Sequence, residues 1–421
     1  MSNTEISGKI ILLVNDGSIR KKFILERLQE LSVKVICLNR TKSDFAVPFV
    51  QDWILADLND ESDCLEKVRE YCKKFDRMPF DGVVTFWDEN IILTASLAEA
   101  FGLVGIPVNI ASAIKNKNDF RAACLQAGIP APHQKLLRNK EEIDNLPANL
   151  KFPLIIKPVY GASSAFVMKT ENIDELKFAF EIIQDHVRSF YLASEWKNLD
   201  ILVEEYVDGP EVDIDILIQD GIIKYFSIID NKETNEPFFV ETGRSCPSSL
   251  NLSVQEQLIN LATDTLNKLG VANGCIHFEA KNSSRGPIPV EVNLRMGGGE
   301  VYLYSKKIWG VDLVEGAVKI ALGVDLQVQK PSQPLTCLAS HRFLPENSCI
   351  IKDQKISAEL KSKPQHVNFY WEKNVGDKFM APPQGYDRSV GVLTISGNDL
   401  KQTKENLSEA LKYISYTVES I

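Results

Sequence analysis

The chain has 421 residues, of which 44% are hydrophobic and 25% are charged, and it carries a formal net charge of -10 at pH 7. This length allows two or three hydrophobic cores at about 150 residues each, so a multidomain globular protein is expected. The acidic balance argues against a nucleic-acid partner, and the lack of an apolar run of ~20 residues or of a secretory signal predicts a cytoplasmic protein without a membrane partner.

The first hundred residues alternate short apolar runs with helical patterns. The predicted strands span residues 9–14, 33–39 and 81–86, the predicted helices span residues 20–31, 61–74 and 89–101, and a further short strand is expected in GLVGIPVN, residues 102–109. This alternation is typical of stacked βαβ units and predicts an N-terminal parallel-sheet domain over residues 1–112. The turn NDGSIRKK after the first strand lacks GxGxxG, so a dinucleotide-dependent oxidoreductase loses its main support.

The next block, residues 113–207, has the pattern of a small α+β domain. A linker helix at 116–128 ends at GIPAP, where glycine and two prolines stop it. Strands follow at 133–137, 153–157, 166–169 and 201–207, with a loop of small residues at 160–165 and a helix at 173–184. We therefore expect a compact unit of antiparallel strands and one helix between two larger parts.

From residue 208 onward the pattern becomes that of an antiparallel sheet. EVDIDILI alternates strictly, IIKYFSIID follows after a QDG turn, and a second hairpin joins CIHFEAK to VEVNLRMGGGE. After KPSQP (330–334), a tail over residues 331–421 carries predicted strands at 336–343, 367–371 and 389–396 and a helix at 399–413. The eight cysteines lack CxxC spacing, so reduced and mostly buried thiols are predicted.

The second hairpin carries the most informative group of polar residues. Glu291, Asn293 and Arg295 alternate along one strand, and Glu279 lies on the other strand with His277 two residues before it. Two carboxylates opposed across a sheet repel each other unless a cation lies between them. Mg2+ prefers carboxylate and amide oxygens together with substrate phosphates, so this group predicts a metal that holds a nucleotide.

Two earlier segments have features of a phosphate and nucleotide site. Lys157 ends an apolar strand and is followed by the small residues Gly161, Ala162, Ser163 and Ser164, whose backbone N–H groups can approach phosphate oxygens. In ILVEEYVDGPE, an apolar strand ends in acidic residues, and Glu211 opens the next strand after a Gly-Pro turn. Such a strand end can meet a purine edge while the later carboxylate accepts ribose hydroxyls.

In this order and spacing, the three segments resemble the ATP-grasp superfamily of carboxylate ligases, over roughly residues 110–325. The resemblance implies an ATP-grasp fold: an N-terminal βαβ domain, a lid domain (113–207) and a C-terminal antiparallel-sheet domain (208–421) with its tail. It implies ATP and Mg2+ as cofactors, with two ions, for which Mn2+ can substitute. The implied nucleotide-binding residues are Lys117, Lys157, Gly161, Ala162, Ser163, Ser164, Glu204, Tyr206, Val207 and Glu211, of which Glu204, Tyr206 and Val207 hold the adenine.

The resemblance also implies catalytic, metal and substrate residues. Arg295 and Lys157 would stabilise the transferring phosphoryl group, and Glu279, Glu291 and Asn293 would coordinate Mg2+. RMGG followed by a helix and GVDL is similar to the peptide-forming branch of L-amino acid ligases and carnosine synthase. On that likeness the implied substrate residues are Gly297 and Gly298 for the acyl donor, Arg244 for a substrate carboxylate, and His277 beside the metal.

The function expected is ATP-dependent joining of two amino acids through an acyl phosphate, with release of ADP and phosphate. Two alternatives stay open at this point. One keeps the fold but phosphorylates bicarbonate or formate, as a carboxylase or a purine-pathway ligase does. The other is a regulatory protein that binds a nucleotide without turnover. The partners expected are small amino acid-like substrates, and a homodimer would be typical of the resemblance.

Overall fold

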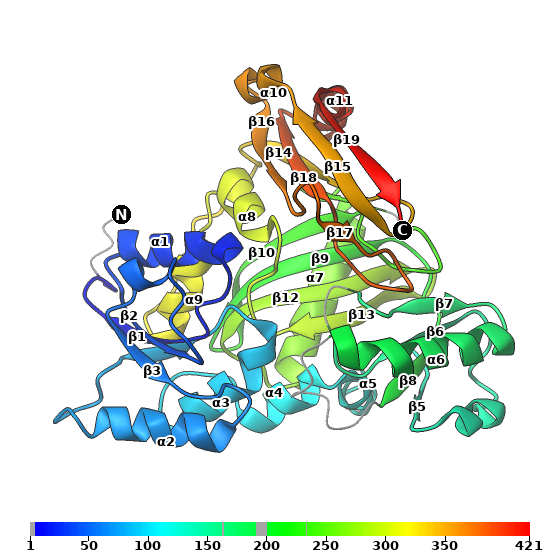
Figure 1. Ribbon diagram of the computed structural model, residues 1–421. Coiled ribbons are helices and arrows are strands. Elements are labelled where there is room, and N and C mark those ends of the chain that lie inside the picture. The colour runs from blue at the N-terminus through cyan, green and yellow to red at the C-terminus, as the bar shows by residue number, and fades with distance from the viewer. Residues whose placement is uncertain (1–4, 162–163, 191–199, 233) are drawn as a thin grey trace.

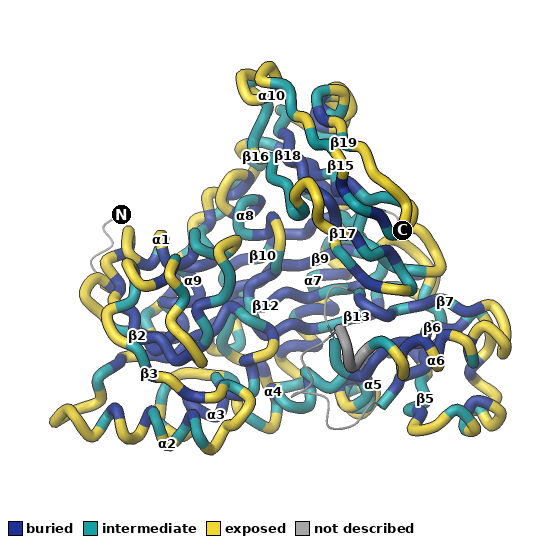
Figure 2. The backbone as a smooth tube through the Cα atoms, in the orientation of Figure 1, coloured by how far each residue is buried: buried dark blue, intermediate teal, exposed yellow. Residues whose placement is uncertain are grey.

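The computed structural model describes residues 5–161, 164–190, 200–232 and 234–421. The N-terminal domain (blue) and a small domain (green) flank a wide antiparallel sheet, and the C-terminal tail (orange to red) rises above that sheet (Figure 1). Buried backbone follows the strands of the sheets, while exposed backbone follows the outer helices and turns (Figure 2). The cores therefore lie between the sheets and the helices that cover them.

The N-terminal domain is built on a parallel sheet, as predicted. Its strands lie in the order β3-β2-β1-β4, namely β3 (Asp52–Leu55), β2 (Lys34–Asn39), β1 (Ile10–Val14) and β4 (Gly82–Val84). The helices are α1 (Lys22–Glu30), α2 (Glu61–Cys72) and α3 (Ile91–Ala100). Leu12 and Val14 pack in one core with α2 and α3, while Ile11 and Leu13 pack in another with α1. Burial on both faces explains why β1 is apolar throughout.

The short strand predicted at residues 102–109 is absent from the described chain, and this prediction was wrong. The segment is a turn that leads into helix α4 (Val108–Lys115). Ala111 and Ile114 are buried at helical spacing and pack with Ile106 and Val108 against the central sheet. A Cβ at Gly105 would lie 2.5 Å from Cβ of Ala98, so the apolar run is fixed by packing against α3 rather than by strand pairing.

The small domain consists of a four-stranded antiparallel sheet covered by one long helix. The strands lie in the order β5-β8-β6-β7, namely β5 (Gln134–Leu137), β8 (Ile201–Glu205), β6 (Leu154–Pro158) and β7 (Met168–Thr170). Helix α6 (Ile173–Phe190) buries Leu176, Phe180 and Ile183, which recur every three or four residues. Helix α5 (Lys117–Gln126) links this domain to α4.

An eight-stranded antiparallel sheet forms the centre of the molecule. Its order is β13-β12-β9-β10-β11-β14-β18-β16, and the strands are β9 (Glu211–Gln219), β10 (Ile222–Asn231), β11 (Arg244–Cys246), β12 (Gly274–Ser283), β13 (Gly286–Asn293), β14 (Cys337–Phe343), β16 (His366–Trp371) and β18 (Gly391–Gly397). The hairpin β9–β10 turns at Asp220 and Gly221, both with positive φ, as a tight two-residue turn requires. The strands predicted in the tail therefore continue the same sheet.

Helices cover both faces of this sheet. Helix α7 (Leu252–Lys268) packs on one face, and α8 (Val301–Trp309) with α9 (Leu313–Ala321) packs on the other. The second of these cores also contains Ile11, Leu13 and Leu25 of the N-terminal domain, so that domain shares a core with the central sheet.

The rest of the tail forms a small sheet above the central one. Its strands β17 (Lys378–Phe379), β15 (Cys349–Ile356) and β19 (Ile414–Ser420) lie beside helices α10 (Ala358–Ser362) and α11 (Leu400–Ala410). All eight cysteines are free thiols, and seven of them are buried. No helix in the described part of the chain has the length and apolar character needed to cross a membrane.

Candidate active site

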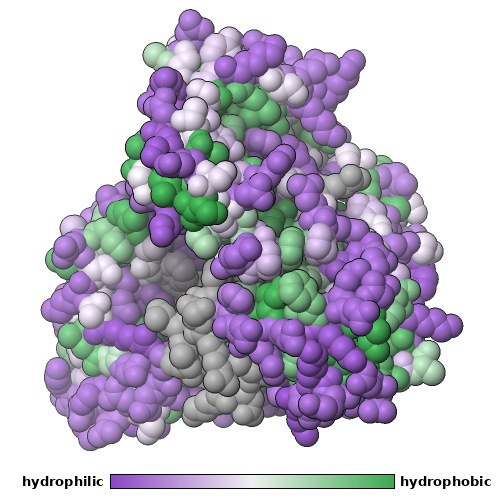
Figure 3. Space-filling view, turned by 45° about the vertical axis from the view of Figure 1, so that its right-hand side comes forward, coloured by the Kyte–Doolittle hydropathy of each residue, from purple (hydrophilic) through white to green (hydrophobic). Residues whose placement is uncertain are grey.

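One cavity of about 970 Å³ lies where the N-terminal domain, the small domain, the central sheet and the tail meet. The surface in Figure 3 is mostly hydrophilic, with separate hydrophobic groups. Every site residue expected from the sequence that the structure describes lines this cavity. Ala162 and Ser163 lie outside the described residues. The cavity thus gathers side chains from positions 117 to 298 in one place.

The metal-binding residues predicted on the hairpin lie together at the floor of the cavity. Glu279 and Glu291 are direct partners across β12 and β13. The Asn293 side-chain amide donates to Oε1 of Glu279 over 3.2 Å. Burial, followed by the charge of Glu291, raises the pKa of Glu279 well above its usual value. Burial has the same effect on Glu291, but the nearby Lys117 and Lys115 outweigh it and lower the pKa of Glu291.

Arg295 was expected to continue the strand that carries Glu291 and Asn293. Strand β13 ends at Asn293, so Arg295 lies beyond it, in the turn before the glycines. Its guanidinium nevertheless folds back and donates to Oδ1 of Asn293 over 3.3 Å and to the carbonyl of Met296 over 3.1 Å. Its Nε lies 3.7 Å from Oδ1 of Asp88 in the N-terminal domain. The arginine therefore sits between the metal ligands and the N-terminal domain.

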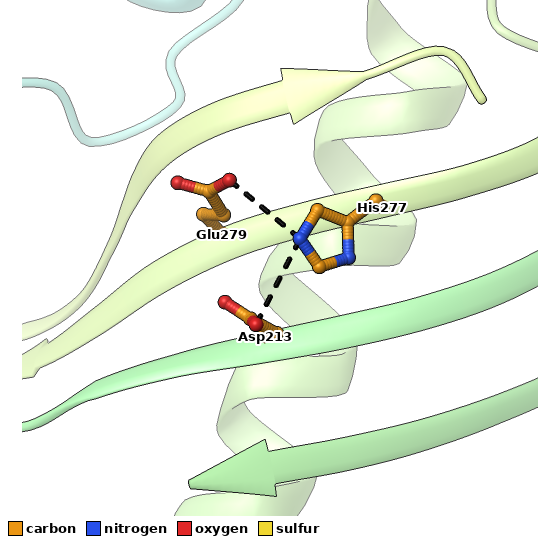
Figure 4. Close-up of side chains that lie close together, drawn as sticks. All are labelled: Asp213, His277 and Glu279. Carbon is orange, nitrogen blue, oxygen red and sulfur yellow. Dashed lines mark ion pairs between the residues drawn. The ribbon is translucent and has the colours of Figure 1, made fainter. Parts of the chain in front are cut away.

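A second carboxylate group, which was not predicted, lies beside Glu279. Nε2 of His277 lies 3.6 Å from Oε1 of Glu279 and 3.8 Å from Oδ2 of Asp213 (Figure 4). Nδ1 of His277 lies 2.9 Å from Oδ1 of Asp215. Burial lowers the pKa of His277, but Asp215 and Asp213 outweigh it and raise the pKa to about 9.

His277 thus lies among three carboxylates, those of Asp213, Asp215 and Glu279. It is 3% exposed and lies under Gly297, where a Cβ would come within 2.6 Å of its Nδ1. Oδ2 of Asp213 and Oδ2 of Asp215 are buried without a hydrogen-bond partner in the described structure. The donor set of Glu279, Glu291 and Asn293 fits a hard divalent cation.

The two predicted phosphate lysines reach the cavity from separate elements. Asn116 caps α5, which places Lys117 in its first turn, and Nζ of Lys117 donates to the carbonyl of Gly161 over 3.1 Å and lies 3.3 Å from Oε2 of Glu291. Lys157 lies in β6 and is 5% exposed. Burial lowers its pKa, whereas Glu204 raises it. Lys117 therefore lies between Gly161 and the hairpin.

Glu204 forms a buried ion triad with Lys157 and with Arg121, a residue that the sequence interpretation missed. Its Oε2 lies 2.6 Å from Nζ of Lys157, and its Oε1 accepts from Nε of Arg121 over 2.7 Å. Burial alone would raise the pKa of Glu204, but the two cations outweigh it and hold the pKa at about 2. The carboxylate of Glu204 is therefore occupied by these two cations.

The remaining residues expected to bind nucleotide also line the cavity. The Tyr206 hydroxyl donates to Oε1 of Glu236 over 2.9 Å, and the Val207 carbonyl accepts from Nζ of Lys281 over 3.1 Å. Burial raises the pKa of Glu211 to about 7, against the opposing effect of Lys281. Ser164 is described and has a positive φ of 53°.

Arg244, expected to bind a substrate carboxylate, lies in β11 and is 5% exposed. Its Nη2 lies 2.9 Å from Oε1 of Glu241 and 3.2 Å from Oδ2 of Asp213, while its Nε and Nη1 have no hydrogen-bond partner in the described structure. Arg342, which the sequence interpretation did not single out, lies 3.5 Å from Glu241 and 3.4 Å from Glu300. Arg244 thus has two buried, unpaired donor groups beside Asp213 and Glu241.

The chain matches two family profiles. One, described as an ATP-grasp domain, matches residues 150–302, and the other, described as an ATP-grasp N-terminal domain, matches residues 26–105. The first covers all the residues of the triad, the hairpin and the triple glycine except Arg121. The second covers most of the parallel-sheet domain.

Curated relatives and solved structures extend this likeness. Carnosine synthase 1 of Gallus gallus is 28% identical over 80% of this chain, and alanine–anticapsin ligase of Bacillus subtilis is 25% identical over 66% of it. The chain spans 38% and 61% of the lengths of these two relatives. The crystal structure of an L-amino acid ligase from Bacillus licheniformis superposes with a TM-score of 0.82 at 22% identity and covers 98% of this chain and 100% of that one. That structural match establishes the fold.

Proposed function

Because the chain belongs to the ATP-grasp family, we propose that it is an ADP-forming ligase that couples a carboxylic acid to an amine. In the first step a carboxylate oxygen of the acid attacks the γ-phosphorus of ATP. The bond from this phosphorus to ADP breaks, ADP leaves, and an acyl phosphate is formed. In the second step the neutral amine attacks the acyl carbon, the C–O bond to phosphate breaks, and the nitrogen loses a proton. The products are an amide, ADP and inorganic phosphate.

One observation carries this proposal: Lys117, Lys157, Glu279, Glu291 and Arg295 converge on a single cavity from four separate elements and the turn after β13. A site that only bound a nucleotide would need the lysines, but it would not need an arginine folded over paired carboxylates. Charge develops on the phosphoryl oxygens during transfer, and fixed cations aimed at that charge are usually the largest catalytic contribution.

We assign the following roles to the side chains. Lys117 and Lys157 hold the phosphates, and Glu204 with Arg121 fixes Lys157 in place. Arg295 directs its planar donors at the phosphoryl group and the acyl phosphate. Glu279, Glu291 and Asn293 would hold Mg2+, with Mn2+ as a substitute, and the ion would neutralise phosphate charge when bound.

We propose amino acids as both substrates, on the strength of the names of the relatives and of the free donors of Arg244. The acyl donor would lie at Gly297 and Gly298, with its carboxylate toward Arg295. We further propose that residues 113–207 form the lid and residues 1–112 and 208–421 the two bodies it closes against. An acyl phosphate hydrolyses in water, so closure would protect the intermediate as well as position it.

The test is a substrate screen with purified protein, Mg2+ and ATP. Pairs drawn from the twenty standard L-amino acids, and bicarbonate or formate in parallel, are assayed for ADP and phosphate release and for product mass. We expect release that needs an amino acid pair and a product whose mass is the sum of the pair minus water. Glu291→Ala should reduce turnover by about 100-fold or more while the circular dichroism spectrum is unchanged.

Release that needs only bicarbonate or formate would contradict the proposal and support the carboxylase alternative. Nucleotide binding without release under any condition would support a regulatory role instead.

A further inference from the structure

Six arginines line the cavity, and five of them lie within 4 Å of a carboxylate. The pairs are Arg20 with Glu372 (2.9 Å), Arg121 with Glu204 (2.7 Å), Arg244 with Glu241 (2.9 Å), Arg295 with Asp88 (3.7 Å) and Arg342 with Glu300 (3.4 Å). Arg388 is the exception: in the part of the chain that the structure describes, no ion pair or hydrogen bond of its side chain is found. It is exposed to the water of the cavity, so its guanidinium is available to a ligand.

The chain positions Arg388 where the tail meets the N-terminal domain. Glu372 follows β16 directly, and its carboxylate lies 2.9 Å from a guanidinium nitrogen of Arg20, which belongs to the short helix Ile19–Lys21. The same carboxylate accepts a hydrogen bond from the hydroxyl of Ser389. Arg388 is the residue before Ser389, so this contact fixes its backbone at the cavity wall. Glu372 is itself used by Arg20 and Ser389 and is not the partner of Arg388.

The other nearby anion is also shared. Burial by the cavity walls lowers the pKa of Arg388, Glu241 raises it, and Arg342 and Arg244 lower it again. Glu241 lies between Arg244 and Arg342, at 2.9 and 3.5 Å. Glu241 is therefore already shared by two other arginines, and Arg388 forms no ion pair of its own within the described residues.

The N-terminal domain brings a further cation to the same end of the cavity. Nζ of Lys21 donates to the carbonyl of Phe86 over 2.6 Å and lies 4.2 Å from the centre of the Trp87 ring. Burial lowers the pKa of Lys21 to about 7, and the charges of Arg295 and Arg388 act in the same direction. Lys21 therefore lies within electrostatic reach of both arginines.

The proposed reaction needs a cation at such a position. The carboxylate of the acyl donor is consumed at Arg295, but an amino acid that serves as the amine keeps its own carboxylate, which enters the cavity charged. A buried carboxylate is tolerated when a planar guanidinium pairs with it through two hydrogen bonds.

We propose that Arg388 binds the carboxylate of the amine substrate, so that the acceptor is an amino acid rather than a simple amine. The inference rests on the proposed ligase function. Arg388 is a specificity residue here, since it contacts the acceptor at a group that does not react.

The test compares acceptors with and without a carboxylate in wild type and three variants. Each L-amino acid accepted in the screen is assayed beside its carboxamide, with Arg388→Gln, Arg388→Lys and, as a control, Arg77→Gln. Arg77 is exposed on the N-terminal domain and lies outside the cavity.

We expect Arg388→Gln to raise KM for the acceptor amino acid about 10- to 100-fold, the cost of a lost hydrogen bond to a charged group. KM for the carboxamide, for the acyl donor and for ATP should be unchanged. Arg388→Lys should recover part of the loss, and Arg77→Gln should behave as wild type. An equal effect on acid and carboxamide, or an effect on ATP or on the acyl donor alone, would overturn the assignment.

Calorimetry separates this inference from the ligase proposal. Wild type and Arg388→Gln are titrated with the same amino acids and carboxamides in the presence of Mg2+ and the non-hydrolysable analogue AMP-PNP. Amino acid binding that is about 10-fold weaker in the variant, without turnover in wild type, would support the Arg388 site and contradict the ligase function. The absence of carboxylate-dependent binding would overturn the site itself.

Discussion

The buried triad of Arg121, Glu204 and Lys157 gives the sharpest prediction for stability. Arg121 is 1% exposed, and besides Glu204 it donates to the carbonyls of Val290, over 2.7 Å, and Pro289, over 3.3 Å. One side chain thus joins α5, the small domain and strand β13. Arg121→Met keeps a long apolar side chain but removes every one of these donors.

Breaking a buried ion pair from one side costs about 3–5 kcal/mol, because the other charge stays buried without a partner. Here Lys157 still pairs with Glu204 over 2.6 Å, so we expect the lower end, about 3 kcal/mol. The free energy of unfolding is measured by urea denaturation followed by circular dichroism. Arg69→Met, an exposed arginine in α2, is the matched control and should change stability by less than about 0.5 kcal/mol.

A double-mutant cycle tests whether the triad acts as one unit. Arg121→Met leaves the buried carboxylate of Glu204 without one of its two cations, and Glu204→Gln removes that buried charge. The double variant should therefore lose less free energy of unfolding than the sum of the two single losses. We expect a coupling free energy of about 1.5 kcal/mol or more. Additivity within about 0.5 kcal/mol would refute the reasoning, since independent sites behave in that way.

Two further predictions concern the glycine turn and the effect of pH. Gly297→Ala should destabilise the fold by about 1–3 kcal/mol and reduce ADP release, because its Cβ would lie 2.6 Å from Nδ1 of His277 and 2.8 Å from Oδ1 of Asp215. Gly298→Ala, where nothing lies within 4 Å of the added Cβ, should keep full stability in thermal unfolding. A raised KM for the acyl donor alone in Gly298→Ala would then locate that substrate. Burial, followed by Lys232, lowers the pKa of His341 from 6.5 to about 4, so the unfolded chain binds the extra proton between these values and stability falls as pH drops below 6.5. Between pH 7 and pH 4 the free energy of unfolding, measured with urea, should therefore fall less in His341→Gln than in wild type, by a difference of at most about 3 kcal/mol. Equal pH profiles of the two proteins would contradict this assignment.

The regular parts of the fold could be predicted because their apolar residues repeat with a clear period. The parallel sheet, the small domain and both hairpins follow from alternation and from glycine turns. Helix α7 was missed although its signals are local: Asn251 caps it by accepting from the N–H of Val254, and Leu258, Leu261 and Leu266 recur at helical spacing. The small sheet of the tail had no such signal, since β15 and β19 are largely polar and their paired residues lie 58 to 71 positions apart in the sequence.

The site was predictable only where residue type and local spacing carried the information. Asp213 and Asp215 follow Glu211 on the same face of a strictly alternating strand, so the acidic side of β9 was visible in EVDIDILI. Arg121 has no comparable signal. It lies in an ordinary helical pattern, and its role depends on Glu204 and on the carbonyls of β13, which reach it only through tertiary packing.

The distribution of cores indicates which part of the molecule can move over the cavity. The N-terminal domain shares a core with α8, α9 and the central sheet, and Arg27 of α1 pairs with Asp312 over 2.7 Å and with Glu315 over 3.1 Å. The small domain has a core of its own, to which the tail adds one residue, Tyr386, whose ring lies 4.4 Å from that of Phe166.

Moving the N-terminal domain would therefore expose a shared core, whereas moving the small domain would separate its own core from Tyr386 and Phe238 and break the pairing of Met168 with Phe238. Tyr386 is two residues before Arg388. A change in the position of the small domain thus acts directly on the loop that presents the proposed carboxylate-binding arginine. Under both proposals, closure over the nucleotide and capture of the acceptor would depend on the same short segment.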